Sequence, residues 1–286
     1  MSHHLSAEQA ATYHRDGFLS PLPAFSEPET TRFRTALAAM ETADGGALAF
    51  ASNQKPHIIH PWLADLVRRP EILDAVESVI GPDILLWGAG FFAKNPHDGK
   101  IVSWHQDSTY WGLSEPEIVT AWVAFTPSTP LSGCMRVIAG THTIDQVPHR
   151  DTHAANNLLS RGQEIAVDVN EADATDLVLQ PGQMSLHHVR LFHGSGMNEA
   201  PHRRIGLALR FIPTRIRQTA GHQDSATLVR GTDRFHNFIA EPRPISENDP
   251  ACLAFHAAMI ERTTNILYRG AAQRPDTHGP ETRTTM

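Results

Sequence analysis

The sequence predicts a mainly β protein, a barrel or jelly roll, preceded by a helical segment. The chain has 286 residues, of which 41% are hydrophobic, so it has enough apolar content to bury a full core. Capped helical patterns fill the first 81 residues, and short apolar runs punctuated by Gly and Pro follow them. Short strands at such spacing are typical of barrels and jelly rolls.

We expect one domain over residues 1–286, because β-sandwiches and barrels often reach this size as one unit. Its predicted parts are a helical segment at 1–81, a core at 82–215 and a C-terminal extension at 216–286. Within the core, residues 148–175 are polar and predict either a helical insertion or a mobile lid.

The N-terminal segment predicts helices through its capping residues. Ser6 and Gln9 form a capping box before a helix that Gly17 ends. Ser26 and Glu29 form a second box before a longer helix that a Gly pair stops. Two shorter helices follow within residues 61–81, since apolar residues recur there at spacings of three and four.

The core predicts strands in five segments, which are residues 84–93, 118–126, 133–140, 176–188 and 203–214. The fourth contains a Pro-Gly turn and predicts two strands. The last segment alternates, so Arg204 and Arg210 should share one face while Arg203 lies on the other.

Charge and composition exclude several classes of protein. The net charge is −7 and the pI is near 6.2, whereas a nucleic-acid binder carries a basic face. No run approaches 18 apolar residues, and the N-terminus lacks the apolar core of a signal peptide. Cys134 and Cys252 make no disulfide framework and no zinc pattern. We therefore expect a cytoplasmic protein with no nucleic-acid or membrane partner; its oligomeric state is not predicted.

Three residues predict a metal centre. His105 and Asp107 are two apart, and on a strand both would point to one face. This pair alone is a weak signal in a chain with 18 histidines. His193, in the segment LFHGSG, completes a set of two histidines and one carboxylate. Such a facial set leaves positions open on iron, as in non-haem Fe(II) oxygenases.

Arg204 predicts a cosubstrate site beside this centre. It follows His193 by eleven residues, and its planar guanidinium suits a carboxylate. That carboxylate would be the distal end of 2-oxoglutarate, whose 2-oxo-acid end would chelate the metal. Ser195 can add a hydroxyl to the same carboxylate.

Taken together, the motifs resemble the phytanoyl-CoA dioxygenase (PhyH) family of Fe(II)/2-oxoglutarate-dependent oxygenases. The resemblance runs from YHRDGFLSP to about Phe211 and includes WHQD, AWVAF, GCMRVIAGTH, PGQMSLHH and HGSGMN. It implies a double-stranded β-helix (jelly-roll) core with the N-terminal helices packed on one sheet. It also implies Fe(II), 2-oxoglutarate as cosubstrate, O₂, and ascorbate as a supporting reductant.

Carried over by motif, the implied site residues are His105, Asp107 and His193 for the metal, and Arg204, Ser195, Ser108 and Trp122 for 2-oxoglutarate. Halogenating relatives have Ala or Gly where this chain has Asp107, so hydroxylation is favoured over halogenation.

The predicted function is hydroxylation of an unactivated C–H bond of a small or medium organic metabolite, with release of succinate and CO₂. One alternative is a cupin-like metal-dependent isomerase or hydrolase that does not use 2-oxoglutarate, against which Arg204 argues, because a buried unpartnered guanidinium is costly. Another is a catalytically inactive jelly-roll binding protein, against which the intact triad argues. We expect the substrate pocket walls to come from residues 53–63, 108–117 and 148–175.

Several residues keep two interpretations. His187 and His188 are a structural pair or lie at the site, and His142 is expected to stabilise a loop. Tyr110 and Trp111 line the substrate pocket or pack in the core. Two roles, substrate binding or an ion pair within the protein, stay open for each of Arg210, Arg136 and Arg161.

Overall fold

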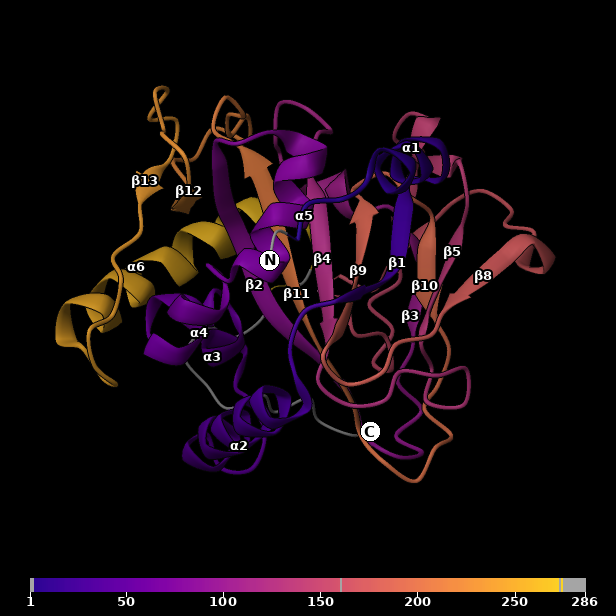
Figure 1. Cartoon of the computed structure of the whole chain (residues 1–286), viewed down its shortest axis with the longest axis horizontal. Helices are drawn as coiled ribbons and strands as arrows, with labels where there is room; N and C mark the ends of the chain where they lie inside the picture. Colours follow the sequence, from indigo (N-terminus) through magenta and orange to yellow (C-terminus); the bar gives the residue numbers. More distant parts are fainter. Residues whose placement is uncertain (1–2, 160, 273, 275–286) are drawn as a thin grey trace.

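The computed structural model describes residues 3–159, 161–272 and 274. Two β-sheets form its centre, and the N-terminal helices cover the outer face of the larger one (Figure 1). This arrangement confirms the predicted jelly-roll class with helices packed on one sheet.

The helices are α1 (Ala7–Asp16), α2 (Glu27–Ala43), α3 (Phe50–Asn53), α4 (Pro61–Leu66), α5 (Pro70–Ile80) and α6 (Pro250–Leu267). Both predicted capping boxes are present. Ser6 and Gln9 bond each other's backbone N–H groups, and Gly17 ends α1 with a left-handed φ of 82°. At the start of α2, the Glu29 carboxylate accepts from the backbone N–H and the hydroxyl of Ser26.

The larger sheet has the order β1-β9-β4-β11-β2-β12-β13. Its strands are β1 (Phe18–Pro23), β9 (Gln183–His188), β4 (Val119–Ala124), β11 (Arg204–Pro213), β2 (Ile84–Lys94), β12 (Ser225–Arg230) and β13 (Ile239–Ala240). The smaller sheet has the order β3-β10-β5-β8 and consists of β3 (Val102–His105), β10 (His193–Ser195), β5 (Met135–Ile138) and β8 (Ala174–Leu177). All pairs in these two sheets are antiparallel except β12 with β13.

The main core lies between the larger sheet and the N-terminal helices. Phe33 and Leu37 of α2 and Ile72 of α5 join Leu207 and Leu209 of β11 in one buried cluster. The predicted alternation along β11 is therefore confirmed, and its other face is turned toward the smaller sheet. A cavity between the two sheets is lined by residues of both.

Two predictions about the core differ from the structure, one on the secondary structure of residues 148–175 and one on the extent of the larger sheet. The helical interpretation of residues 148–175 is wrong, because this segment forms the hairpin strands β6 (His149–Asp151) and β7 (Gln163–Ile165) and a short 3₁₀ turn. The hairpin is tied to the smaller sheet by the Ser103 hydroxyl, which donates to the carbonyl of Gln163 at 2.6 Å.

The larger sheet also extends beyond the predicted core at 82–215, since β1 precedes this range while β12 and β13 follow it. The end of the predicted C-terminal extension, after residue 274, lies outside the described residues.

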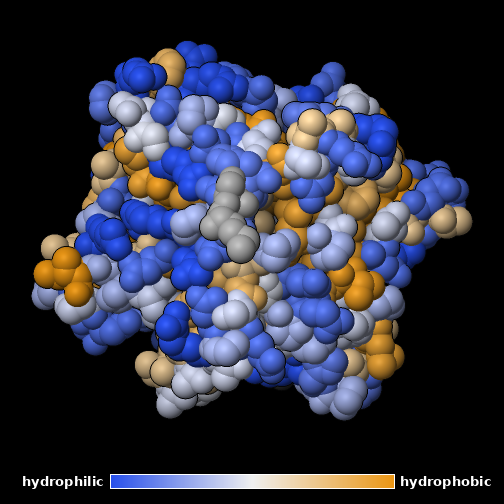
Figure 2. Space-filling view, viewed as in Figure 1, coloured by the Kyte–Doolittle hydropathy of each residue, from blue (hydrophilic) through white to orange (hydrophobic). Residues whose placement is uncertain are grey.

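On the face shown in Figure 2, hydrophilic residues predominate and hydrophobic ones are scattered among them. Among the described residues, no helix is both long and apolar enough to cross a membrane.

Candidate functional site

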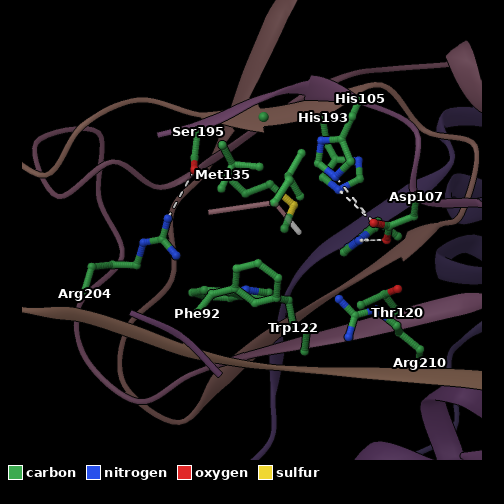
Figure 3. Close-up of a pocket in the computed structure, with 15 residues that line it drawn as sticks. Phe92, His105, Asp107, Thr120, Trp122, Met135, His193, Ser195, Arg204 and Arg210 are labelled. Carbon is green, nitrogen blue, oxygen red and sulfur yellow. Dashed lines mark hydrogen bonds and ion pairs between the residues drawn. The ribbon is translucent and has the colours of Figure 1, made fainter. Parts of the chain in front are cut away.

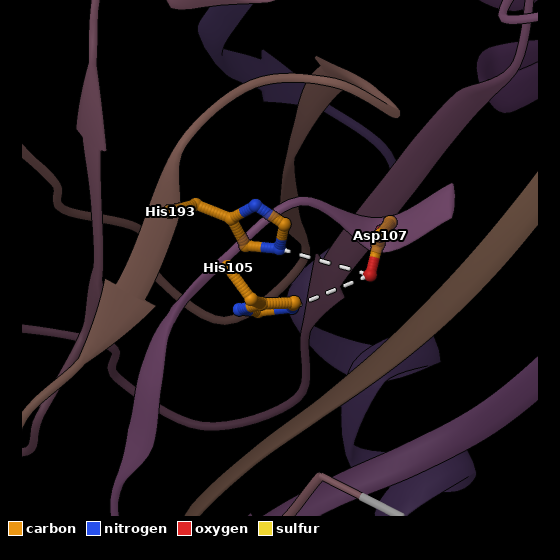
Figure 4. Close-up of side chains that lie close together, drawn as sticks. All are labelled: His105, Asp107 and His193. Carbon is orange, nitrogen blue, oxygen red and sulfur yellow. Dashed lines mark ion pairs between the residues drawn. The ribbon is translucent and has the colours of Figure 1, made fainter. Parts of the chain in front are cut away.

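The predicted metal ligands lie together between the two sheets. His193 of β10 is the direct cross-strand partner of His105 of β3, and their ring centroids are 4.1 Å apart. The candidate ligand atoms of His105, Asp107 and His193 all lie within 4.8 Å of one another (Figure 4). Both histidines are buried, and the Asp107 side chain is only 10% exposed.

Asp107 reaches the site in a different way from the one predicted. Strand β3 ends at His105, and Asp107 opens a 3₁₀ turn over Asp107–Tyr110. The intervening Gln106 is extended, and the Asp107 N–H donates to the carbonyl of Val189 at 2.9 Å. The carboxylate is therefore held by a turn and not by a continuing strand.

Gln106 holds this turn in place and was missed by the sequence analysis. It is fully buried, and its backbone N–H donates to Nε2 of His149 at 3.0 Å. Its side-chain amide donates to the carbonyl of Arg190 and accepts from the N–H of Val147. Because these partners come from two separate loops, only the folded structure reveals the role.

Backbone carbonyls fix the tautomers of both histidines. Nδ1 of His105 lies 2.9 Å from the carbonyl of Ser103, and Nδ1 of His193 lies 2.9 Å from that of Leu191. A carbonyl only accepts, so Nδ1 carries the proton and Nε2 presents its lone pair. Such outer hydrogen bonds orient histidine ligands in metal sites.

The charges of this group also suit a divalent metal. Burial lowers the pKa of His193 well below its ordinary value, and the nearby His105 adds to this effect. Burial alone would raise the pKa of Asp107, but the surrounding histidines His105, His187 and His193 outweigh it and hold that pKa well below the usual range. A neutral imidazole beside an ionised carboxylate matches the donor set of an Fe(II) oxygenase.

Arg204 lies at another side of the cavity, beside Ser195 (Figure 3). Its Nη2 donates to the carbonyl of Gly133 at 2.7 Å and to the Ser195 hydroxyl oxygen at 3.3 Å. The residue is 3% exposed, and its Nε has no hydrogen-bond partner among the described residues. Burial lowers the pKa of Arg204 to about 10, which still leaves the group charged.

Lys94 is a second basic residue beside Arg204, in contact with Ser195 behind the cavity lining, and the sequence analysis missed it. It is fully buried directly opposite Arg204, across the β2–β11 pair. Its Nζ donates to the Ser195 hydroxyl oxygen at 2.6 Å and to the carbonyl of Gly196 at 2.5 Å. Burial and then the charge of Arg204 lower its pKa to about 6. The sequence feature that could have indicated its role is a lysine at the end of an otherwise apolar strand.

These two basic groups form no close ion pair in the part of the chain that the structure describes, although the more distant Asp98 acts on both. Among the described residues, no carboxylate lies within 4.0 Å of Lys94 or Arg204. With a pKa of about 6, Lys94 is largely neutral at neutral pH while the site is empty, and a bound anion would favour its charged ammonium form. Ser195 already accepts from both groups, so its own proton is free to donate to that anion.

Trp122 forms a wall of the same pocket. Its ring lies under Arg204, with the guanidinium carbon 5.2 Å from the ring centroid. This position requires Gly206, because a Cβ there would come within 1.9 Å of the indole. The remaining cavity residues are Phe92, Val102, Thr120, Met135, Leu159, His187, Gly194, Ala208 and Arg210, with the three metal-ligand candidates.

Some predicted residues lie elsewhere. The Ser108 hydroxyl donates to the side chain of Gln146, and Ser108 is not among the cavity residues, so the structure does not bring it to the site. Of the described residues in the three loops expected to line the substrate pocket, only Leu159 reaches the cavity. Arg203 pairs with Glu41 on the helical side, which confirms the predicted strand face.

The two neighbouring histidines of β9 point to different cavities. His187 lines the cavity, with its Nε2 3.7 Å from Oδ2 of Asp107. His188 points to another hollow, where its ring lies 5.4 Å from that of His142. As expected for a loop-stabilising residue, His142 bonds the carbonyl of His14 through Nε2.

The structure also shows the contacts of the arginine and aromatic residues for which two roles were open. Arg136 forms ion pairs with Glu171 and Asp176, and Arg161 pairs with Asp151. The Tyr110 hydroxyl donates to Asp151, and the centroid of its ring lies 3.7 Å from the guanidinium carbon of Arg161. Trp111 packs in a buried apolar cluster. Neither aromatic lines the cavity, and of these arginines only Arg210 does.

The comparisons with known proteins agree with this geometry. The family model described as "Phytanoyl-CoA dioxygenase (PhyH)" matches residues 13–206. A curated relative from Stutzerimonas stutzeri, "Probable alpha-ketoglutarate-dependent hypophosphite dioxygenase", is 29% identical over 155 residues, 53% of this chain and 53% of its own. The chain spans about half the length of the curated relatives it matches first.

Two solved structures share most of the fold. The apo form of the non-heme monooxygenase ThoJ is 36% identical with a TM-score of 0.81, covering 91% of this chain and 98% of its own. The structure "CytC3 with Fe(II) and alpha-ketoglutarate" is 25% identical with a TM-score of 0.63, covering 83% and 93%. Together with the match over residues 13–206, these likenesses show that the chain belongs to the phytanoyl-CoA dioxygenase family.

Proposed function

We propose that this protein is an Fe(II)- and 2-oxoglutarate-dependent dioxygenase that hydroxylates an unactivated C–H bond of a small or medium organic metabolite. The observation that carries the proposal is the buried group of His105, Asp107 and His193, whose ligand atoms converge with both imidazoles already in the required tautomer. These three residues would hold the iron and leave positions open for cosubstrate and O₂.

The pocket beside the metal site fits 2-oxoglutarate. Arg204 and Lys94 would bind its distal carboxylate, and the free proton of Ser195 would add a hydrogen bond. Trp122 would hold the carbon chain against the sheet. The chemistry that bound iron supplies is the oxidative decarboxylation of 2-oxoglutarate by O₂ to succinate and CO₂, coupled to hydroxylation of the substrate.

Hydroxylation is supported over halogenation by Asp107, since its carboxylate occupies the position that a halide ligand would need. The isomerase or hydrolase alternative leaves the buried basic residues Lys94 and Arg204 without a use. An inactive binding module has no need for two preset histidine tautomers.

An anaerobic titration tests this function. Adding Fe(II) and then 2-oxoglutarate should produce the weak visible absorption band of a metal-chelated 2-oxo acid. His193→Ala and Asp107→Gly should lose the band and weaken iron binding, while Arg203→Ala serves as the matched control because it faces the helices. After O₂ is admitted, succinate release should depend on a substrate from a metabolite panel. A wild-type band in His193→Ala would show that the metal lies elsewhere.

A further inference from the structure

A second guanidinium in the cavity, that of Arg210, forms no hydrogen bond or close ion pair with any residue that the structure describes. Arg210 lies on β11 with its side chain on the same face as Arg204, and it lines the same cavity. In the described part of the chain it forms no hydrogen bond and no ion pair within 4.0 Å, and its Nε is buried and unsatisfied. By contrast, Arg161, Arg203 and Arg230 each pair with a carboxylate. The carboxylate that acts on Arg210 is Asp107, which lies beyond ion-pair distance and is itself a candidate metal ligand. A half-buried cation without a close counter-ion is costly unless a ligand supplies one.

Two more unsatisfied polar groups lie in the same row of the sheet. Arg210 of β11 pairs with Thr120 of β4, and Thr120 in turn pairs with His187 of β9. Directly opposite residues place their side chains on one face about 5 Å apart. Thr120 Oγ1 and His187 Nδ1 are both buried without a hydrogen-bond partner among the described residues, and both residues line the cavity. Three adjacent positions thus present unused hydrogen-bonding groups.

Aromatic rings hold the guanidinium in place. Its central carbon lies 5.3 Å from the ring centroid of Trp111 and 5.8 Å from that of Phe92. On the neighbouring strand, Gly88 leaves room for it, since a Cβ there would touch the Arg210 Cδ at 3.4 Å. Cation–π contacts orient a guanidinium but do not neutralise it. The group is therefore positioned and remains available to an anion.

The position of this row separates it from the 2-oxoglutarate pocket. Arg204 and Arg210 are six residues apart on an extended strand, about 20 Å between their Cα atoms. In Figure 3, Arg204 lies with Ser195 on one side, whereas Arg210 and Thr120 lie below Asp107 on the other. A cosubstrate seated on Arg204 leaves the Arg210 end of the cavity for the substrate. Ala208 lies between the two arginines on β11, and the cavity lining also includes the apolar residues Met135 and Leu159.

We propose that Arg210, aided by Thr120 and His187, binds a carboxylate of the substrate, so that the substrate is an organic acid with an apolar carbon skeleton. This inference rests on the proposed dioxygenase function and names the substrate class for it. A bidentate carboxylate on Arg210 would fix one end of the molecule beside Asp107, and the apolar wall would hold the carbon to be hydroxylated near the metal.

Matched pairs of ligands test the proposal. The probes are acetate through octanoate, benzoate and phenylacetate, each compared with its primary amide, which has the same skeleton without the charge. Each is titrated into the full-length protein loaded anaerobically with Fe(II) and 2-oxoglutarate, and binding is read from the shift of the visible band. Wild type should bind at least one acid about tenfold or more tightly than its amide. In Arg210→Gln this acid should lose about 30-fold or more in affinity, and Arg210→Lys should recover part of it.

Three controls make the outcome decisive. Arg203→Gln, an arginine near the same strand but facing α2, should keep the preference for acids. Arg210→Gln should melt within a few degrees of wild type without ligands, because Arg210 forms no hydrogen bond or close ion pair in the described part of the chain; a large drop in melting temperature would indicate a structural arginine. Arg210→Gln should also bind 2-oxoglutarate within about twofold of wild type.

The remaining outcomes overturn one idea or the other. If no acid is preferred over its amide in wild type, or if the preference persists in Arg210→Gln, the carboxylate site is wrong. If Arg210→Gln instead weakens 2-oxoglutarate as strongly as Arg204→Gln does, Arg210 serves the cosubstrate and this inference fails while the dioxygenase function stands. Failure of the proposed function itself would appear as a missing visible band in wild type.

Discussion

At the scale of single residues, the site is defined by groups that the fold leaves without partners. Arg204 and Lys94 are buried opposite each other, and Arg210 is held between aromatic rings. None of the three forms an ion pair within 4.0 Å with a residue that the structure describes. Residues outside the site show the opposite behaviour, for example Arg203 with Glu41. Unpaired buried charge reduces stability, and its retention is therefore an argument for ligand binding.

Arg204→Ala should weaken 2-oxoglutarate binding by about 30-fold or more, because the distal carboxylate would lose its bidentate partner. Iron affinity without cosubstrate should change little, since Arg204 is not a ligand. Arg204→Lys should recover part of the affinity, as a point charge cannot replace the planar fork. Anaerobic titration followed by the visible band measures all of these, with Arg203→Ala as the control. If Arg203→Ala were the damaging variant, the assigned strand faces would be reversed.

Lys94 should make 2-oxoglutarate affinity depend on pH. Its pKa of about 6 in the free protein results from burial and then from Arg204, against the weaker opposite effects of Asp98 and Cys134. A bound carboxylate favours the ammonium form and raises this pKa, so binding takes up a proton above about pH 6.

Affinity should consequently fall as the pH rises above about 6, by up to about tenfold per pH unit, until the pKa of the complex is reached. Calorimetric titrations between about pH 6 and pH 8 would measure this slope. Lys94→Met should bind more weakly at the acidic end and show a much flatter profile. An unchanged slope in that variant would assign the proton uptake to another group.

At the scale of elements, the sequence predicts helices and strands that depend on local patterns better than those that depend on long-range strand pairing. Capping boxes located α1 and α2, and alternation located β11, because both signals lie within a few neighbouring residues. Strand β1 contains two prolines and no alternation, and it forms the edge of its sheet. The hairpin of β6 and β7 carries no apolar pattern, so its strands could not be found from the sequence.

The same distinction applies to the site. The triad and Arg204 lie in recognisable motifs, whereas the row of Arg210, Thr120 and His187 exists only through the register of three strands. Lys94 and Gln106 likewise gain their roles from partners about 40 to 100 residues away, which no local pattern encodes.

Gly206→Ala tests how closely β4 and β11 must approach. The new Cβ would lie 1.9 Å from the Trp122 ring, so the indole must leave its place beneath Arg204. We expect a loss of about 1–3 kcal/mol in the free energy of unfolding, together with weaker 2-oxoglutarate binding. Gly196→Ala is the matched control for stability, because a Cβ there meets nothing within 4 Å. Denaturant unfolding compares the two variants, and cosubstrate titration compares Gly206→Ala with wild type; an equal loss of stability in both variants would contradict the packing argument.

At the scale of the whole molecule, each sheet supplies one half of the site. The smaller sheet provides both histidine ligands on β3 and β10, and the larger sheet provides Arg204 and Arg210 from the two ends of β11. Metal and cosubstrate should therefore connect the two sheets. Helices packed on the outer face of the larger sheet leave the inner face free to carry polar groups.

This arrangement predicts a stepwise gain in thermal stability. Without ligands, the protein holds an ionised Asp107 between the sheets, and the charged Arg204 opposite Lys94 without a close ion pair among the described residues. A ligand at 100 times its dissociation constant stabilises the folded state by about 2.7 kcal/mol, which corresponds to a rise in melting temperature of about 5 °C or more for a domain of this size. Anaerobic melting with Fe(II), and then with Fe(II) plus 2-oxoglutarate, should show two successive increases. Arg204→Ala should keep the first increase and lose most of the second, whereas His193→Ala should lose both, because the cosubstrate chelates through the metal. A full second increase in Arg204→Ala would show that 2-oxoglutarate does not bridge from the metal to the larger sheet.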